Sequence, residues 1–196
     1  MKFTQIPVNT FKELVLNAGI LASNFTPATG TVEADDILGA TSGGISFTAK
    51  PTFIDLGVDI DNCPPNTKEL KKLQSWDEIN MSGTYLTVNT AQAKSLLAAA
   101  DVGGSDTTKV TPRNDVAPTD FNDIWWIGDY SDKNGATNGG YIAIHMMNAL
   151  STGGFQIQSG DKAKGQFAFE YTAHYSMDAA DTVPFEIYIK AGTEEA

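Results

Sequence analysis

The sequence is poor in the residues that most often carry reactive or cross-linking chemistry. Its 196 residues include a single cysteine, Cys63, and two histidines, His145 and His174. One cysteine excludes a disulfide within the chain and a site built from several thiolates. No apolar run approaches the roughly 18 residues of a membrane helix, and Lys2 is followed by an interrupted apolar pattern rather than a signal-peptide core. We therefore expect no membrane segment and a protein that stays in the compartment where it is made.

Positive charge is also scarce. The chain has 13 Lys and Arg residues against 24 Asp and Glu residues, which gives a formal net charge of −11. Proteins bind the phosphates of nucleic acids through Lys and Arg side chains that release counterions. The excess of negative charge therefore excludes a protein that binds DNA or RNA generally through the phosphates.

Core-forming residues are plentiful, but the first part of the chain differs from the rest. Apolar residues make up 41% of the sequence, which is enough for one folded domain. A capping box at Thr10–Glu13, followed by apolar residues at helical spacing, predicts a short helix of about eight residues. Polar, Pro and Gly residues then dominate up to residue 44. We interpret residues 1–43 as an N-terminal arm, partly mobile in the monomer.

From residue 44 onward, apolar residues alternate with polar ones, as in β-strands. The pattern predicts strands in the ranges 45–49, 53–56, 76–88, 121–130, 141–149, 166–177 and 185–189. It also predicts one helix that starts at Asn89 or Thr90 and ends at Gly103–Gly104. We expect a mainly β fold over residues 44–191: an antiparallel β-sandwich or barrel with one flanking α-helix. Residues 57–75 form a long loop in this prediction, and residues 192–196 an acidic tail.

No arrangement of residues in the sequence is typical of a catalytic or metal site. Both histidines lie in predicted strands, and neither a G-x-S-x-G nor an H-E-x-x-H motif is present. A calcium loop counted from Asp59 would place Pro64 where glycine is needed and Leu70 where the bidentate glutamate belongs. We expect no enzyme activity, no metal and no cofactor. A hydrolase built around His145 or His174 is a minor alternative.

The adjacent pair Trp125 and Trp126 raises the possibility of a contact surface. Neighbouring residues of a strand point to opposite faces, so we expect one ring in the core and the other in a second layer or against another chain. Exposed aromatic rings on a β-sandwich also stack on sugars. A carbohydrate-binding β-sandwich is therefore an alternative of a different class.

Several strings of the sequence resemble the major tail proteins, or tail tube proteins, of long-tailed phages and prophages of Gram-positive bacteria. They are FTAKPTF at 47–53, DIDNCP at 59–64, NTKELKKL at 66–73, SGT at 82–84, TPRND at 111–115, DIWWIGDYSDKNG at 123–135, MNALSTGGF at 147–155, KGQF at 164–167 and VPFEIYIK at 183–190. The resemblance covers most of residues 44–191.

The resemblance implies a structural subunit that is not an enzyme. It implies hexameric rings stacked into a hollow, acidic-walled tube for DNA ejection in the virion, made of copies of a chain produced in the host bacterial cytoplasm. The implied partners are the chain itself, the tape measure protein, the tail terminator and the baseplate or distal tail proteins; DNA passes in transit without specific binding, and no membrane is involved. A tube subunit of a tail-like bacteriocin is a related alternative.

Three groups of residues follow as candidates for these contacts. The loop 57–75 is the candidate for contact between rings because it carries both signs of charge, at Asp59, Asp61, Lys68, Glu69, Lys71 and Lys72. The candidates for the wall of the channel are Asp129, Asp132 and Glu170. The candidates for an aromatic contact between subunits are Trp125 and Trp126.

Overall fold

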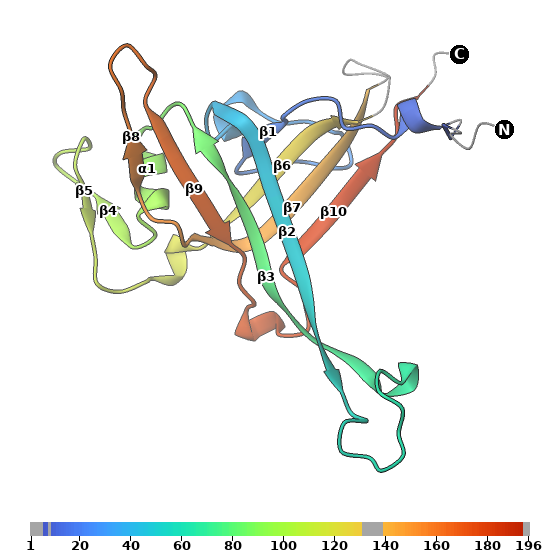
Figure 1. Cartoon of the computed structure of the whole chain (residues 1–196). Coiled ribbons are helices and arrows are strands. Elements are labelled where there is room, and N and C mark those ends of the chain that lie inside the picture. The colour runs from blue at the N-terminus through green and yellow to red at the C-terminus, as the bar shows by residue number, and fades with distance from the viewer. Residues whose placement is uncertain (1–5, 8, 131–138, 194–196) are drawn as a thin grey trace.

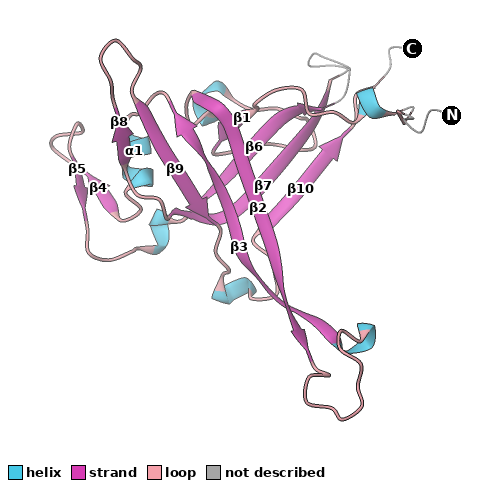
Figure 2. Ribbon diagram, viewed as in Figure 1, coloured by secondary structure: helices cyan, strands magenta, loops and turns pink. Residues whose placement is uncertain are grey.

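The computed structural model describes residues 6–7, 9–130 and 139–193, and these residues form a mainly β structure with antiparallel sheets and one α-helix (Figures 1 and 2). The elements are β1 Ile20–Ala22, β2 Thr41–Asp55, β3 Lys71–Tyr85, α1 Thr90–Leu96, β4 Ala100–Val102, β5 Val110–Pro112, β6 Asn122–Tyr130, β7 Gly140–Ser151, β8 Gln156–Gln158, β9 Gln166–Thr172 and β10 Phe185–Lys190. The mainly β fold with one helix is confirmed at this level.

The main sheet has two halves that are joined through β7. One half has the strand order β2–β3–β9–β8, and the other has the order β1–β6–β7–β10. All of these pairs are antiparallel, and the last residues of β7, Leu150 and Ser151, pair with β9 to join the halves. β4 and β5 form a separate small sheet beside α1. Below, the two groups are called the β2–β8 half and the β1–β10 half.

The hydrophobic core lies between the two halves. Alternate residues of β3 and β9 face it, including Met81, Phe169 and Tyr171, and they meet Ile144 and Met146 of β7. The alternation predicted for Phe167, Phe169 and Tyr171 is confirmed, although β9 ends at Thr172 rather than at residue 177. The period of two arises because successive side chains of a strand point to opposite faces.

The N-terminal helix predicted from the capping box is wrong. Only residues Thr10–Lys12 form a short 3₁₀ turn. Helices of this length are unstable in water unless other parts of the protein pack on their apolar face. Here Leu14, Val15 and Leu16 remain exposed, and the backbone instead follows the edge of β6, with a bridge between Val15 and Tyr130.

The rest of the predicted arm contributes to the core. β1 pairs with β6, and Leu21, Ala22 and Phe25 are buried. The backbone N–H of Leu38 donates to the carbonyl of Leu21 at 2.9 Å, which brings the following segment back onto the same strand. β2 begins at Thr41, three residues before the expected boundary at residue 44.

Helix α1 begins where the sequence predicts and ends earlier. Asn89 caps it: its side chain accepts from the Gln92 N–H, and the Gln92 side chain accepts from the Asn89 N–H, both at 2.8 Å. The helix stops at Leu96 because Ala98 adopts a left-handed conformation with φ 62°, and Ala100 already belongs to β4. The stop predicted at Gly103–Gly104 is therefore wrong.

Residues 57–75 are not a single loop. β2 and β3 are each 15 residues long and form a hairpin whose end projects from the body of the molecule (Figure 1). β3 already begins at Lys71, so the irregular part is shorter than predicted. The projecting segment, residues 51–76, is called the hairpin arm below.

Candidate functional site

The hairpin arm exposes large apolar side chains. Phe53 of β2 lies opposite Leu73 of β3, and Ile54 lies opposite Lys72. The exposed apolar residues of the arm are Phe53, Ile54, Leu56, Val58, Ile60 and Leu73. A group of exposed apolar side chains on one element marks an interaction surface. The arm is therefore the strongest candidate contact element of the chain.

The tip of the arm is held in one shape by its own hydrogen bonds. The carboxylate of Asp55 accepts from the N–H of Gly57 at 2.9 Å and from the N–H of Asn66 at 3.2 Å. The hydroxyl of Thr67 donates to the carbonyl of Pro64 at 2.7 Å. Both of these hydrogen bonds of the Asp55 carboxylate are made within the arm. The arm presents a preformed shape, which lowers the entropy cost of binding.

The charged residues predicted for contact between rings all lie exposed on this arm. Asp59, Asp61, Lys68 and Glu69 lie in the irregular tip. Lys71 and Lys72 lie in β3 rather than in the loop, because the strand begins there. The ammonium group of Lys71 lies 5.5 Å from the centre of the Phe53 ring.

The two tryptophans point to opposite faces of β6, as predicted, and both make contacts inside the subunit. Trp125 is 7% exposed, and its ring stacks on His145 with the ring centres 3.9 Å apart. Trp126 is partly buried against the main core, and its indole N–H donates to the carbonyl of Ala18 at 3.0 Å. Trp125 therefore has no free face for a sugar or for another subunit.

The candidates for the channel wall do not lie on one surface. Glu170 lies on β9, in the β2–β8 half, and points away from the core. Asp129 lies on β6, in the β1–β10 half, on the face of that half that is turned away from the same core, and Asn17 donates to it. Asp132 lies outside the described residues. The two described carboxylates therefore belong to opposite sides of the molecule.

The outward face of the β2–β8 half is a broad polar surface with little charge. Its residues lie in rows across the strands and are Ser46, Thr48, Asn80, Ser82, Thr84, Gln156, Gln158, Gln166, Glu170 and Thr172. Lys50 and Glu78 continue the face as an ion pair. The hydroxyl of Thr172 donates to the side chain of Asn80 at 2.9 Å. The polar positions of the predicted strands signalled this face, but only strand pairing brings them together.

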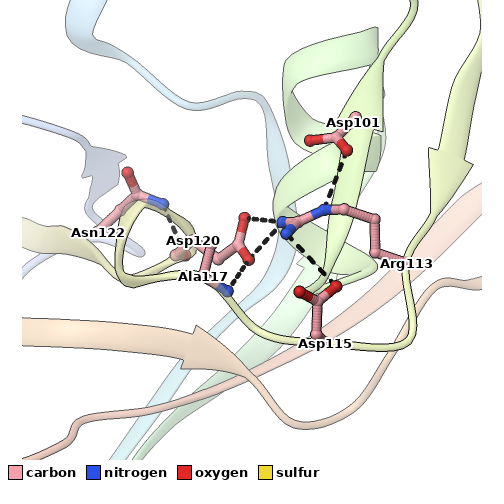
Figure 3. Close-up of polar contacts among 6 residues, drawn as sticks. All are labelled: Asp101, Arg113, Asp115, Ala117, Asp120 and Asn122. Carbon is pink, nitrogen blue, oxygen red and sulfur yellow. Dashed lines mark hydrogen bonds and ion pairs between the residues drawn. The ribbon is translucent and has the colours of Figure 1, made fainter.

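Arg113 is the centre of a polar network that the sequence analysis missed (Figure 3). Its Nη2 lies 2.7 and 2.5 Å from the two carboxylate oxygens of buried Asp120, and its Nε lies 3.1 Å from Asp101. The N–H of Ala117 donates to Asp120 at 2.8 Å. This N–H and the guanidinium group lower the pKa of Asp120, and the hydrogen bond to Asp120 raises the pKa of Arg113. The network fastens the segment after β5 to the start of β6.

A cavity of about 420 Å³ lies beside this network, next to α1. Its lining includes Asp120, Lys94 and the hydroxyl-bearing rings of Tyr85 and Tyr171. Burial raises the pKa of Tyr171, and its hydroxyl lies 3.1 Å from that of Ser95. Asp120 is already bonded to Arg113, and the Tyr171–Ser95 contact joins β9 to α1.

The side chain of each histidine contacts a neighbouring strand. His145 Nε2 lies 3.1 Å from Asp123 of β6, and its Nδ1 lies 3.8 Å from Glu186 of β10. His174 Nδ1 lies 3.2 Å from the carbonyl of Asn148. Cys63 lies in the tip of the arm, with its sulfur 3.6 Å from the hydroxyl of Thr67. None of these contacts pairs a histidine with a hydroxyl or thiol nucleophile.

Comparison with known proteins gives no match to this chain, either among protein-family models or among curated proteins. Within the described ranges, no helix combines the length and the apolar character that a membrane span requires.

Proposed function

We propose that this chain is the structural subunit of a phage tail tube, which joins copies of itself into hexameric rings that stack into a hollow conduit for DNA ejection. The observation that carries the proposal is a sheet half with two different open edges. In the described residues, β2 pairs only with β3 at one end of the β2–β8 half, and β8 pairs only with β9 at the other. Unpaired strand edges bind further strands unless they are covered.

The strand directions allow these edges to join in a ring. β2, β3, β9 and β8 alternate in direction, so a further β2 placed beside β8 continues the antiparallel order. Joining β8 of one copy to β2 of the next uses two different surfaces, and such a head-to-tail contact closes into a ring when the rotation fits. Six copies are what the resemblance to tail tube proteins implies.

The apolar side chains on the inner face of the same half support this contact. Ile157 of β8 is 62% exposed although it lies on the face that carries buried Phe167. Ile45 and Phe47 of β2 lie on the core side of the opposite edge. A β8–β2 contact would cover Ile157 with a neighbour's apolar side chains. In this arrangement the two halves form a β-sandwich around the core, and the ring shares one continuous sheet.

The outward polar face of the β2–β8 half would then line the channel. Its charged residues are Lys50, Glu78 and Glu170, and Lys50 is already paired with Glu78. Such a wall offers DNA almost no free cation to bind, which suits a molecule in transit. The proposed wall is weakly charged rather than strongly acidic, and of the two candidates that the structure describes, Glu170 lies on it and Asp129 does not.

The remaining parts of the proposal rest on the resemblance. They are the location in the virion tail and the tape measure, tail terminator and baseplate or distal tail proteins as partners. A tube of a tail-like bacteriocin would use the same ring and remains the second candidate. A carbohydrate-binding site at Trp125 is not supported, because the ring of Trp125 is covered within the subunit.

Electron microscopy of the purified chain at rising concentration tests the proposal. We expect rings and short tubes with a central channel, and a sedimentation profile that shifts from monomer to ring without stable intermediates. A single particle at every concentration and salt condition would contradict the proposal.

A further inference from the structure

The open edge of β2 carries backbone groups that have no strand partner among the described residues. The N–H of Ala173, just after β9, donates to the carbonyl of Ile79 at 3.0 Å, so Ile79 of β3 bonds toward β9. Bonding alternates between the two sides along a strand, so Asn80 bonds toward β2, where Thr48 lies opposite it. The residues of β2 that bond toward the open side are therefore Ile45, Phe47 and Ala49.

Two irregularities limit the usable part of this edge. Gly43 and Gly44 have φ values of 79° and 81°, and the register with β3 shifts around them, which marks a bulge. A Cβ on either residue would meet nothing within 4 Å, so the backbone conformation and not packing requires glycine there. At the other end the register shifts between Lys50 and Pro51, and proline has no N–H to donate. The edge therefore accepts a partner strand only along residues 45–50.

Strand β8 offers an open edge of similar length. The carbonyl of Glu170 on β9 accepts from the N–H of Thr152 at 2.9 Å, so Glu170 bonds toward the side of β9 on which β8 lies. Ala168, two residues away, bonds toward the same side, where Gln156 lies opposite it. By the same alternation, Ile157 directs its own N–H and carbonyl toward the open side of β8.

We infer that the backbone of Ile157 pairs directly with that of Phe47 in the neighbouring copy of the ring; the inference rests on the proposed tube. This register places the flanking residues in two further pairs, Phe155 with Ala49 and Ser159 with Ile45. All three pairs lie between the bulge and the proline. A shift by one residue would turn the apolar side chains of β8 to the polar face, so the competing registers are those shifted by two.

The bulge and the proline reject both of these shifted registers. A shift toward the start of β2 places Ser159 opposite Gly43, inside the bulge. A shift the other way places Phe155 opposite Pro51, which lacks the N–H that the pair needs. Only the central register gives each of the three residues on the open side of β2 a partner that can both donate and accept.

The side chains agree with the same register. Phe155 is 39% exposed and lies against Phe167, with the ring centres 5.9 Å apart. The residue placed opposite it is the small Ala49, which leaves space for the ring. On the outward face, Gln156 lies beside Thr48, so the polar rows of the sheet continue from one copy into the next.

Disulfide formation without a linker tests the register. Three chains carry Gln156→Cys and Cys63→Ser together with one further change: Ser46→Cys, Thr48→Cys or Lys50→Cys. Directly opposite residues of such a pair have Cα atoms about 4.5 Å apart, which suits a disulfide, whereas diagonal neighbours are about 7–8 Å apart. Each chain therefore reports one register. After assembly under reducing conditions and then oxidation, we expect the Thr48→Cys chain to form a covalent ladder at least tenfold faster than the other two.

The outcomes separate the register from the tube itself. Faster linkage of the Ser46→Cys or Lys50→Cys chain would overturn the inference, because it would show a shifted register. Equal linkage of all three chains, or rings without linkage in any of them, would also overturn it. An unchanged chain that forms no rings would instead overturn the proposed tube, and the inference with it.

Discussion

The Ile157→Lys variant is expected to stay folded but to remain monomeric at concentrations at which the unchanged chain forms rings. Ile157 is 62% exposed in the subunit, so the change leaves the folded monomer almost unaffected. At the proposed β8–β2 contact the same position is buried, and a lysine there loses the apolar burial and places an unpaired charge in the seam.

The size of this effect follows from repetition around the ring. Losing the burial of one isoleucine costs about 2 kcal/mol, which is roughly a 30-fold weaker contact. Every subunit contact of a closed ring is weakened by the same free energy, so the protein concentration at which rings form rises steeply. Sedimentation velocity measures the shift, with Met177→Lys as the control because Met177 is 98% exposed and lies outside the seam. Normal rings from Ile157→Lys would contradict the proposed contact.

Leu21→Ala is expected to destabilise the monomer strongly, although Leu21 lies in the segment that the sequence predicts to be a partly mobile arm. Leu21 is fully buried in the main core, beside residues of both sheet halves. Replacing a buried leucine by alanine costs about 2–5 kcal/mol of unfolding free energy, because transfer free energy is lost and a cavity remains.

The neighbouring residue provides the control. Ile20 lies on the same short strand but is 38% exposed, so Ile20→Ala is expected to cost about 1 kcal/mol or less. Denaturant unfolding of the two variants gives the comparison. Equal, small losses in both would mean that β1 does not pack in the monomer, as the arm hypothesis holds.

The sequence predicted best those elements whose buried and exposed side chains follow a pattern among neighbouring residues of the chain. The strands β6, β7, β9 and β10 were placed within a few residues, because alternate side chains of each strand face the core or solvent. The cap of α1 was also predictable, since Asn89 and Gln92 are neighbours in the chain. The predicted helix after Thr10 failed because its apolar residues found no core to pack against, whereas the edge of β6 was within reach.

The candidate site was less predictable because it depends on strand pairing. Lys71 and Lys72 read as loop residues, but pairing with Asp55 and Ile54 draws them into β3. Asp129 and Glu170 both looked outward, yet only the order of the strands shows that they lie on opposite halves. Arg113 contacts Asp101, Asp115 and Asp120. The turns that bring these residues together are not predicted by any motif in the sequence.

Cross-linking the two proposed ring edges tests the central claim most directly. Gln156 of β8 pairs with Ala168, which pairs with Thr84 on the next strand. Ser46 of β2 lies on the same face, opposite Ser82, two residues from that row. A chain with Ser46→Cys, Gln156→Cys and Cys63→Ser is assembled and treated with a short thiol-reactive linker, and chains with only one of the new cysteines serve as controls. We predict a ladder of covalent species that ends at six subunits, and monomers in both controls. A ladder absent from assembled material, or one that stops at two subunits, would contradict the closed head-to-tail ring.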